Sequence, residues 1–215
     1  FQQPRTALIV VSDGMDIPDN LHAIANESSM PLIVSKLPAP ELIYHLQFYL
    51  ARALSPRSSM HGVLLSVMGH GVLLTGESGI GKSELALELI SKGHHLVADD
   101  AVTLRRTSPE HLEGYCNPKF SHFIEVRGLG ILNICEMFGK SATRLTKRVE
   151  LIVNLQRMDP EHLNDMDRLH QQQKTRKILG IAIPEITVPV MPGRNLSVLI
   201  EAAVRNQILA SRGYN

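Results

Sequence analysis

A glycine-rich segment that ends in lysine and serine constrains this chain more than any other feature of its sequence. Residues 76–83 read Gly-Glu-Ser-Gly-Ile-Gly-Lys-Ser and match the phosphate-loop pattern G-x-x-x-x-G-K-[ST]. The apolar run 72–75 before the loop predicts a buried strand, and residues 84–92 after it predict a helix. In this context backbone N–H groups and a helix N-terminus bind a polyphosphate, and the alternative is a structural glycine turn before a helix. The sequence therefore predicts nucleotide binding.

Each part of this loop has an expected role in such a site. The Lys82 ammonium can reach the terminal phosphates, and the Ser83 hydroxyl can hold Mg²⁺. The residues expected to surround the nucleotide phosphates are Gly76, Glu77, Ser78, Gly79, Ile80, Gly81, Lys82 and Ser83.

Composition narrows the class of protein further. The chain has 215 residues and a net charge of +1, which gives no reason to expect a nucleic-acid partner or a polybasic membrane patch. Two cysteines cannot form a disulfide framework, and no apolar run approaches the ~18 residues of a membrane span. The low cysteine content favours a cytoplasmic protein. The chain starts at Phe1 without Met, so we expect a truncated or renumbered piece of a longer protein.

The pattern of elements predicts an α/β fold in two parts. Residues 1–56 alternate strands (7–11, 31–35) with helices (17–27, 40–54), which indicates the C-terminal part of a small α/β N-terminal domain. Residues 57–215 are expected to form a P-loop nucleotide-binding domain with a central mixed sheet. The second helix carries an apolar stripe at helical spacing, which consists of Leu42, Ile43, Leu46, Tyr49 and Leu50.

The larger part is rich in short predicted strands. Residues 63–67 and 72–74 flank a turn and predict a hairpin. Residues 159–175 are polar, lack a core stripe and are expected to form a mobile excursion, and 196–209 predict an amphipathic helix. That helix can dock a subunit or a substrate, or be buried in its own domain. The other expected strands are 96–98, 102–104, 123–127 and 149–153.

The acidic pair Asp99-Asp100 ends a predicted strand soon after the phosphate-loop helix. Neighbouring strand residues point to opposite faces, so we expect only one of the two to face the nucleotide. That residue can act as a general base or hold Mg²⁺. The alternative is a turn-forming Asp pair at a strand end.

Four further residues have a structural and a functional interpretation. Glu125 and Arg127 share a strand face before a glycine turn; they form a surface ion pair, or they contact Mg²⁺ and phosphate respectively. A single histidine such as His61 is more often structural than catalytic. Arg168 is by default a solvated side chain, but a mobile arginine can close over a γ-phosphate.

Several segments together resemble the bacterial HPr kinase/phosphorylase family. They occur in the family's order and the resemblance covers essentially the whole chain, with residues 1–56 similar to the latter part of the family's N-terminal domain. The segments that carry the resemblance are 61–64, 76–83, 93–100, 124–133 and 192–196.

The resemblance implies a specific enzyme. Members of the family use ATP and Mg²⁺ to phosphorylate a regulatory serine on HPr, a small phosphocarrier protein, and they assemble as homohexamers. They also reverse the reaction by attack of inorganic phosphate on phosphoserine, which gives pyrophosphate. The carried-over positions are Ser83 and Glu125 for Mg²⁺, Lys82 for the transferred charge, Asp100 for the serine proton, and His61 and Arg168 for further catalytic roles.

Asp100 can serve both directions if it is buried or flanked by anions, because reversal needs the same group in its other protonation state. One departure concerns the reverse direction: Met191 stands where the family often has Arg, which removes a bidentate phosphate contact. The kinase activity therefore follows from the resemblance more directly than the phosphorylase activity. The segment around this position is Val188, Pro189, Val190, Met191, Pro192 and Gly193.

Two alternative functions use the same phosphate loop. A small-molecule kinase would need a closed pocket beside Asp100, whereas a protein substrate needs an open face. A nucleotide-gated binding module would transfer no phosphoryl group. A regulatory GTPase is disfavoured because the chain has no Asn-Lys-x-Asp motif.

Overall fold

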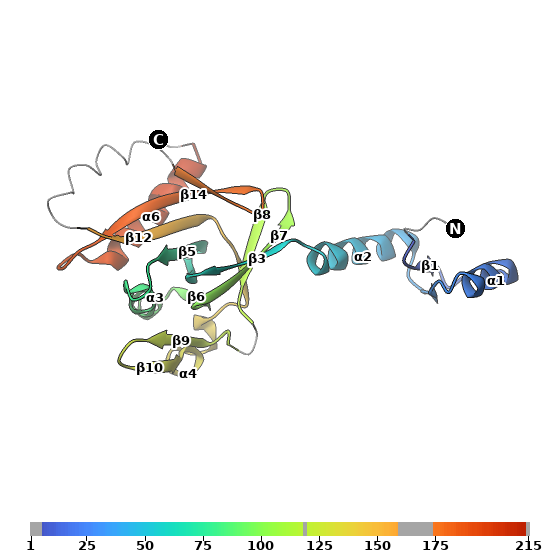
Figure 1. The fold of residues 1–215 in the computed structure, drawn as a ribbon, viewed down its shortest axis with the longest axis horizontal. Coiled ribbons are helices and arrows are strands. Elements are labelled where there is room, and N and C mark those ends of the chain that lie inside the picture. Colours follow the sequence, from blue (N-terminus) through green and yellow to red (C-terminus); the bar gives the residue numbers. More distant parts are fainter. Residues whose placement is uncertain (1–5, 118–119, 159–173, 214–215) are drawn as a thin grey trace. The chain divides into compact units, whose positions relative to one another are not determined.

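The structure is a computed structural model that describes residues 6–117, 120–158 and 174–213. The chain divides into two units, Phe1–Leu54 and Ser55–Asn215, and each is described by itself (Figure 1). Among the described residues, no helix has the length and apolar character needed to span a bilayer.

The first unit contains the four elements predicted for it. Strands β1 (Ile9–Val11) and β2 (Leu32–Val34) pair in parallel and are connected through α1 (Asp19–Glu27), and α2 (Ala39–Ala53) follows. Pro40 lies in the first turn of α2, where its missing N–H costs nothing. The apolar stripe of α2 is not a core face within this unit, because the helix has no buried residue.

A six-stranded mixed sheet forms the centre of the second unit, as predicted. The parallel strands β14, β12 and β5 form its middle, and the remaining pairs are antiparallel. The predicted hairpin is confirmed: Met68 and Gly69 connect β4 to β5 with positive φ angles, as a two-residue turn requires. The strands in spatial order are β13 (Lys174–Ile178), β14 (Ile181–Val190), β12 (Leu151–Arg157), β5 (His70–Gly76), β4 (Val63–Val67) and β6 (His95–Ala98).

A second, fully antiparallel sheet has the strand order β11, β8, β7, β3. A separate hairpin of β9 and β10 leads into the short helix α4 and the 3₁₀ turn η1. Their bounds are β3 (Arg57–His61), β7 (Ala101–Ser108), β8 (His111–Tyr115), β9 (Phe123–Val126), β10 (Gly130–Asn133), α4 (Ile134–Phe138), η1 (Lys140–Ala142) and β11 (Thr146–Arg148).

The central sheet is buried on both faces because its strands alternate between two cores. Val63, Leu65, Val72 and Leu74 belong to one apolar cluster, which also includes side chains of the two long helices. Leu64 and Leu73 point the other way, into a cluster shared with the second sheet. The near-continuous apolar runs of β4 and β5 therefore reflect a sheet with no solvent-exposed face at these strands.

Helices α3 (Lys82–Ser91) and α6 (Leu196–Ser211) cover the first of these faces (Figure 1). Ile200 and Val204 of α6 are buried, so the apolar face of this helix packs within its own domain. A polar contact also joins α6 to the turn that follows α3, since His94 Nε2 lies 2.8 Å from Glu201 Oε1.

Two sequence predictions need correction. Lys174 and Thr175, expected in a polar excursion, belong to the edge strand β13, whose pairing with β14 supplies the structure that its charged sequence does not indicate. The strand predicted over 149–153 begins at Leu151 and extends to Arg157. The rest of the predicted excursion, 159–173, lies outside the described residues.

Candidate active site

The phosphate-loop segment lies between β5 and α3, as the sequence predicts. Gly76, Gly79 and Gly81 all have positive φ angles. Gly81 is the N-cap of α3 in the left-handed conformation, so the helix N-terminus opens directly onto the loop. The backbone therefore has the form needed to surround an anion.

Lys82 lies inside the loop although it is charged. Only 7% of the residue is exposed, and its Nζ donates to the carbonyl oxygens of Gly76 at 3.0 Å and Glu77 at 2.9 Å. An ammonium has three donors, so these contacts of the described residues leave one for a ligand. The charge is thus held at the centre of the loop.

Asp99 connects three elements at this site. The Ser83 hydroxyl of α3 donates to Asp99 Oδ1 at 3.2 Å, and the Glu125 backbone N–H of β9 donates to Asp99 Oδ2 at 2.9 Å. Burial raises the pKa of the Asp99 carboxyl above its ordinary value, although these hydrogen bonds act in the opposite direction. A carboxylate that loses hydration in this way gains from a nearby cation.

Asp100 occupies a corner between the two sheets. The chain passes from β6 to β7 at Asp99-Asp100 and from β3 to β4 at Gly62, and Gly62 N–H donates to Asp100 O at 3.1 Å. Across this corner His61 Nδ1 lies 2.9 Å from Asp100 Oδ1. The Asp100 side chain is 73% exposed, so of the two conditions named for it, burial or a flanking anion, burial does not apply. The anion that flanks it is Asp99.

The strand alternation from which we expected only one aspartate to face the nucleotide does not extend to these residues, because β6 ends at Ala98. Asp99 and Asp100 both line the cavity beside the phosphate loop. Asp100 has φ +64°, and this left-handed residue breaks the alternation that a regular strand would impose. The turn at Asp99-Asp100, expected from the sequence as the structural alternative, therefore brings both carboxylates to this cavity.

Two arginines lie close to Gly79 in the loop. The guanidinium nitrogens of Arg127 lie 3.4 and 3.5 Å from the position that a Cβ on Gly79 would occupy. Arg157, which sequence reasoning missed, donates from Nη2 to Gly79 O at 3.3 Å. Arg157 ends β12, the parallel neighbour of the phosphate-loop strand. A positively charged residue at the carboxyl end of this strand could have indicated a phosphate contact. It was missed because the strand was predicted to end at residue 153.

The segment 188–193 lies at the same sheet edge but outside the cavity that holds the carboxylates. Val188, Pro189 and Val190 end β14, and Met191 and Pro192 line a separate hollow with Arg157 and Met158. Gly193 shares another hollow with Gly81 and Glu84 of the phosphate-loop helix. Parallel strands β5, β12 and β14 thus carry the loop, Arg157 and Met191 to one edge.

Ten of the twenty predicted site residues converge on one cavity of about 370 Å³. Among the described residues of the loop, Gly76, Glu77 and Ile80 do not line it, and Ile80 is buried beneath the loop. Arg168 lies outside the described residues. The predicted residues that line the cavity are His61, Ser78, Gly79, Gly81, Lys82, Ser83, Asp99, Asp100, Glu125 and Arg127.

The oxygen atoms of this cavity suit a hard divalent cation. Among the described residues, no group of three or more His, Cys, Asp or Glu side chains is placed to hold a metal alone. Mg²⁺ does not require such a group, since it binds through one or two carboxylates, substrate phosphates and water. Ser83, the partly buried Asp99 and the exposed Glu125 fit that mode of binding.

Comparisons with known proteins agree on one family. The model of the HPr serine kinase C-terminal domain matches residues 52–215, and that of the HPr serine kinase N terminus matches residues 1–50. Proteins named HPr kinase/phosphorylase from Nitrosomonas europaea and Neisseria meningitidis are 52% and 50% identical over 209 and 207 residues. These alignments cover 97% and 96% of the chain but 65% of each relative, so the chain spans about two-thirds of their length.

A solved structure of the HPr(Ser) kinase/phosphatase from Coxiella burnetii is also similar. It is 39% identical in sequence, with a TM-score of 0.64 over 73% of this chain and 94% of the solved one.

Proposed function

The chain belongs to the HPr serine kinase family, and from this membership we propose that it transfers the γ-phosphoryl group of ATP to a regulatory serine of HPr. In the reverse direction, inorganic phosphate attacks phosphoserine-HPr and pyrophosphate leaves. We assign both reactions to the predicted catalytic domain, 57–215, with residues 1–56 as part of an N-terminal domain and a homohexamer as the assembly.

One observation favours a protein substrate over a metabolite: the proposed proton carrier stands open to solvent. The Asp100 side chain is 73% exposed, and its cavity opens onto the surface beside the β9–β10 hairpin. A metabolite kinase needs walls around the acceptor hydroxyl to exclude water. An open carboxylate instead suits a serine carried on the surface of another folded protein.

In the kinase direction, the serine oxygen bonds to the γ-phosphorus while the bond to the β–γ bridging oxygen breaks. Asp100 takes the serine proton, and His61, at 2.9 Å, orients the accepting carboxylate. Lys82, held on the loop carbonyls, balances the charge that develops on the leaving phosphate. Arg127 adds positive charge above Gly79, and Arg168 is proposed as a further cation at the γ-phosphate.

Ser83, Glu125 and Asp99 would hold Mg²⁺ together with the nucleotide phosphates, and the ion would neutralise part of the negative charge on those phosphates. In the reverse direction the same residues act on a different nucleophile. Inorganic phosphate binds in the loop, its oxygen bonds to the phosphoserine phosphorus, and the bond to the serine oxygen breaks. Asp100 then returns a proton to the serine.

The direct test incubates the full-length protein with HPr, ATP and Mg²⁺ and measures the mass and the phosphosite of HPr. We expect one added phosphoryl group on a serine, lost when ATP is replaced by inorganic phosphate, with release of pyrophosphate. The Lys82→Ala protein should bind HPr but modify it about 10²–10³-fold more slowly, the scale of a lost charge-stabilising contact. If HPr stays unmodified while ATP is bound, a small-molecule kinase becomes the better assignment.

A further inference from the structure

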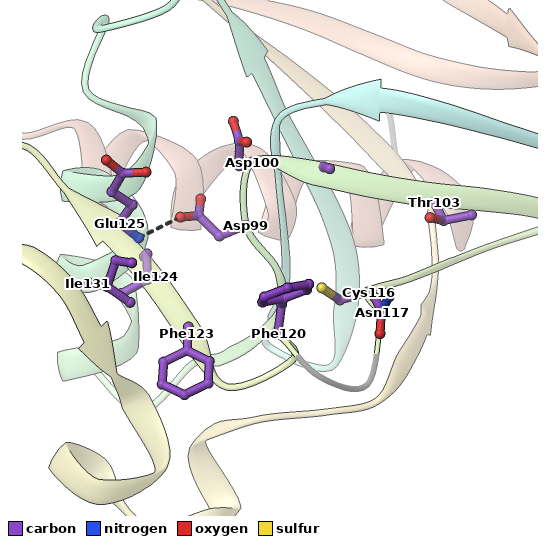
Figure 2. A pocket seen from close by; sticks show the side chains of 11 residues that line it. Asp99, Asp100, Thr103, Cys116, Asn117, Phe120, Phe123, Ile124, Glu125 and Ile131 are labelled. Carbon is purple, nitrogen blue, oxygen red and sulfur yellow. Dashed lines mark hydrogen bonds between the residues drawn. The ribbon is translucent and has the colours of Figure 1, made fainter.

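A second cavity, of about 600 Å³, adjoins the active site and is apolar in character (Figure 2). Asp99, Asp100 and Glu125 line both this cavity and the one beside the phosphate loop. The three carboxylates therefore form the shared border of the two. We call the second cavity the acceptor pocket; its side chains beyond that border include Cys116, Phe120, Phe123 and Ile131.

One wall of the acceptor pocket is the outer face of the β9–β10 hairpin. Glu125 pairs directly with Ile131, and Phe123 lies two residues before Glu125 on the same face. The residues of the opposite face, Ile124 and Val126, are buried in the core, so the hairpin is anchored from behind. Yet 72% of Ile131 and 38% of Phe123 are exposed. Large apolar side chains gathered at the surface beside a functional carboxylate indicate a binding site rather than a solvated face.

The chemistry of phosphoryl transfer determines which reactant this pocket can meet. The phosphate loop holds the leaving β-phosphate, and the attacking oxygen must approach the γ-phosphorus from the opposite side, roughly in line. Asp99, Asp100 and Glu125 separate the loop from the acceptor pocket. The pocket therefore lies on the acceptor's side of the reaction. A nucleotide base, attached at the far end of the triphosphate, has no reason to lie there.

We propose that the acceptor pocket binds an apolar side chain of the protein substrate, one to three positions from the acceptor serine in its sequence. This assignment rests on the proposed function and adds the specificity element that the catalytic residues lack. Successive Cα atoms are about 3.8 Å apart, so a serine at Asp100 brings such a neighbour within reach of Phe123 and Ile131. The carboxylates of the border bind the serine hydroxyl, and the apolar wall binds the neighbouring side chain of the substrate.

The test compares two pocket variants, Ile131→Ser and Phe123→Ala, with Leu145→Ser as a matched control. Leu145 is 65% exposed, close to Ile131 in exposure, and does not belong to the described lining of either cavity. Initial rates are measured with HPr varied at saturating ATP, and with ATP varied at saturating HPr. Thermal unfolding of each variant checks that the fold is intact; the high exposure of Ile131 makes its substitution the safer of the two.

We expect the KM for HPr to rise about 10-fold in each pocket variant, the scale of a lost apolar contact. The KM for ATP and the kcat at saturating HPr should stay within about 2-fold of wild type, and Leu145→Ser should match wild type in every parameter. A second series replaces each HPr residue within three positions of the serine by alanine. One apolar position should reproduce the 10-fold loss with the wild-type enzyme and cause little further loss with Ile131→Ser.

Three results would overturn the proposal. An unchanged KM for HPr in both variants removes the pocket from substrate recognition. A rise confined to the KM for ATP assigns the pocket to the nucleotide, and a change in oligomer mass by light scattering assigns it to a second copy of the chain. Wild-type enzyme that binds ATP but leaves HPr unmodified refutes the proposed function, and the pocket's role with it, before any variant is made.

Discussion

Replacing Gly76 with alanine tests how the phosphate loop is anchored to the sheet. Gly76 ends β5 with φ +140°, and its partner in the neighbouring strand β12 is Leu155. A Cβ on residue 76 would lie 2.5 Å from Leu155 O and 3.3 Å from Leu155 Cβ. The first contact is with backbone, so relief requires two adjacent central strands, or the loop itself, to shift.

Two costs add in the Gly76→Ala protein. The φ angle is strained for any residue with a Cβ, at about 1–3 kcal/mol. Displacing packed backbone adds about 1–3 kcal/mol. We therefore expect the free energy of unfolding to fall by about 2–6 kcal/mol. Gly69→Ala is the matched control: Gly69 has φ +81°, but no heavy atom of the described residues lies within 4 Å of its added Cβ. This control carries the φ cost alone.

Urea unfolding gives the free energy of each variant, and titration calorimetry with ATP gives its affinity. Gly76→Ala should lose about 1–3 kcal/mol more stability than Gly69→Ala, with an unchanged m-value. It should also bind ATP more weakly, because the residue that moves begins the anion-binding loop. Equal losses of stability in the two variants would show that the close approach to Leu155 does not anchor the loop to the sheet.

Three further substitutions address the site itself. In the ligand-free protein, the pKa of Asp99 is raised, so the folded state loses stability as the pH rises from the ordinary value of 3.8 through that raised pKa. Asp99→Asn should remove this loss. The prediction is contradicted if the melting temperatures of the two proteins change with pH in the same way across that range. Arg157→Ala should weaken ATP binding by about 2- to 10-fold without lowering the melting temperature, since the side chain is exposed and its hydrogen bond among the described residues is to the loop. Unchanged affinity in calorimetry would show that Arg157 plays no part in ATP binding. Met191→Arg should leave kinase turnover intact and raise phosphorolysis, measured as pyrophosphate release; no change would show that this position does not limit phosphate attack.

The local elements of the nucleotide site were predictable because their signals are short in range. The strand, glycine loop and helix around residues 76–83 follow from apolar periodicity and from backbone angles that favour glycine. The hairpin with its turn at Met68-Gly69 was predictable for the same reason. Edge strands such as β13, whose charged sequence resembles a loop, were missed because pairing with β14 rather than composition gives them their structure.

The placement of the Asp99 and Asp100 carboxylates could not be predicted from such local signals. Regular strand alternation predicts that Asp99 and Asp100 face apart, and a single left-handed residue at the corner of two sheets reverses that result. Asp99 contacts Ser83 and the backbone of Glu125, which lie 16 and 26 residues away in the chain. Such contacts depend on how β6, α3 and β9 pack, which no local pattern encodes.

By itself, then, the sequence determined the α/β class, the phosphate loop with Lys82 and Ser83, and the resemblance that family models matching residues 1–50 and 52–215 bear out. These depend on residue type and spacing along one segment at a time. Only the tertiary structure decided that Asp100 is open to solvent beside His61, that Arg157 reaches the loop, and that an apolar pocket adjoins the carboxylates. Exposure and convergence are properties of surfaces, and a surface exists only after distant strands and helices have packed.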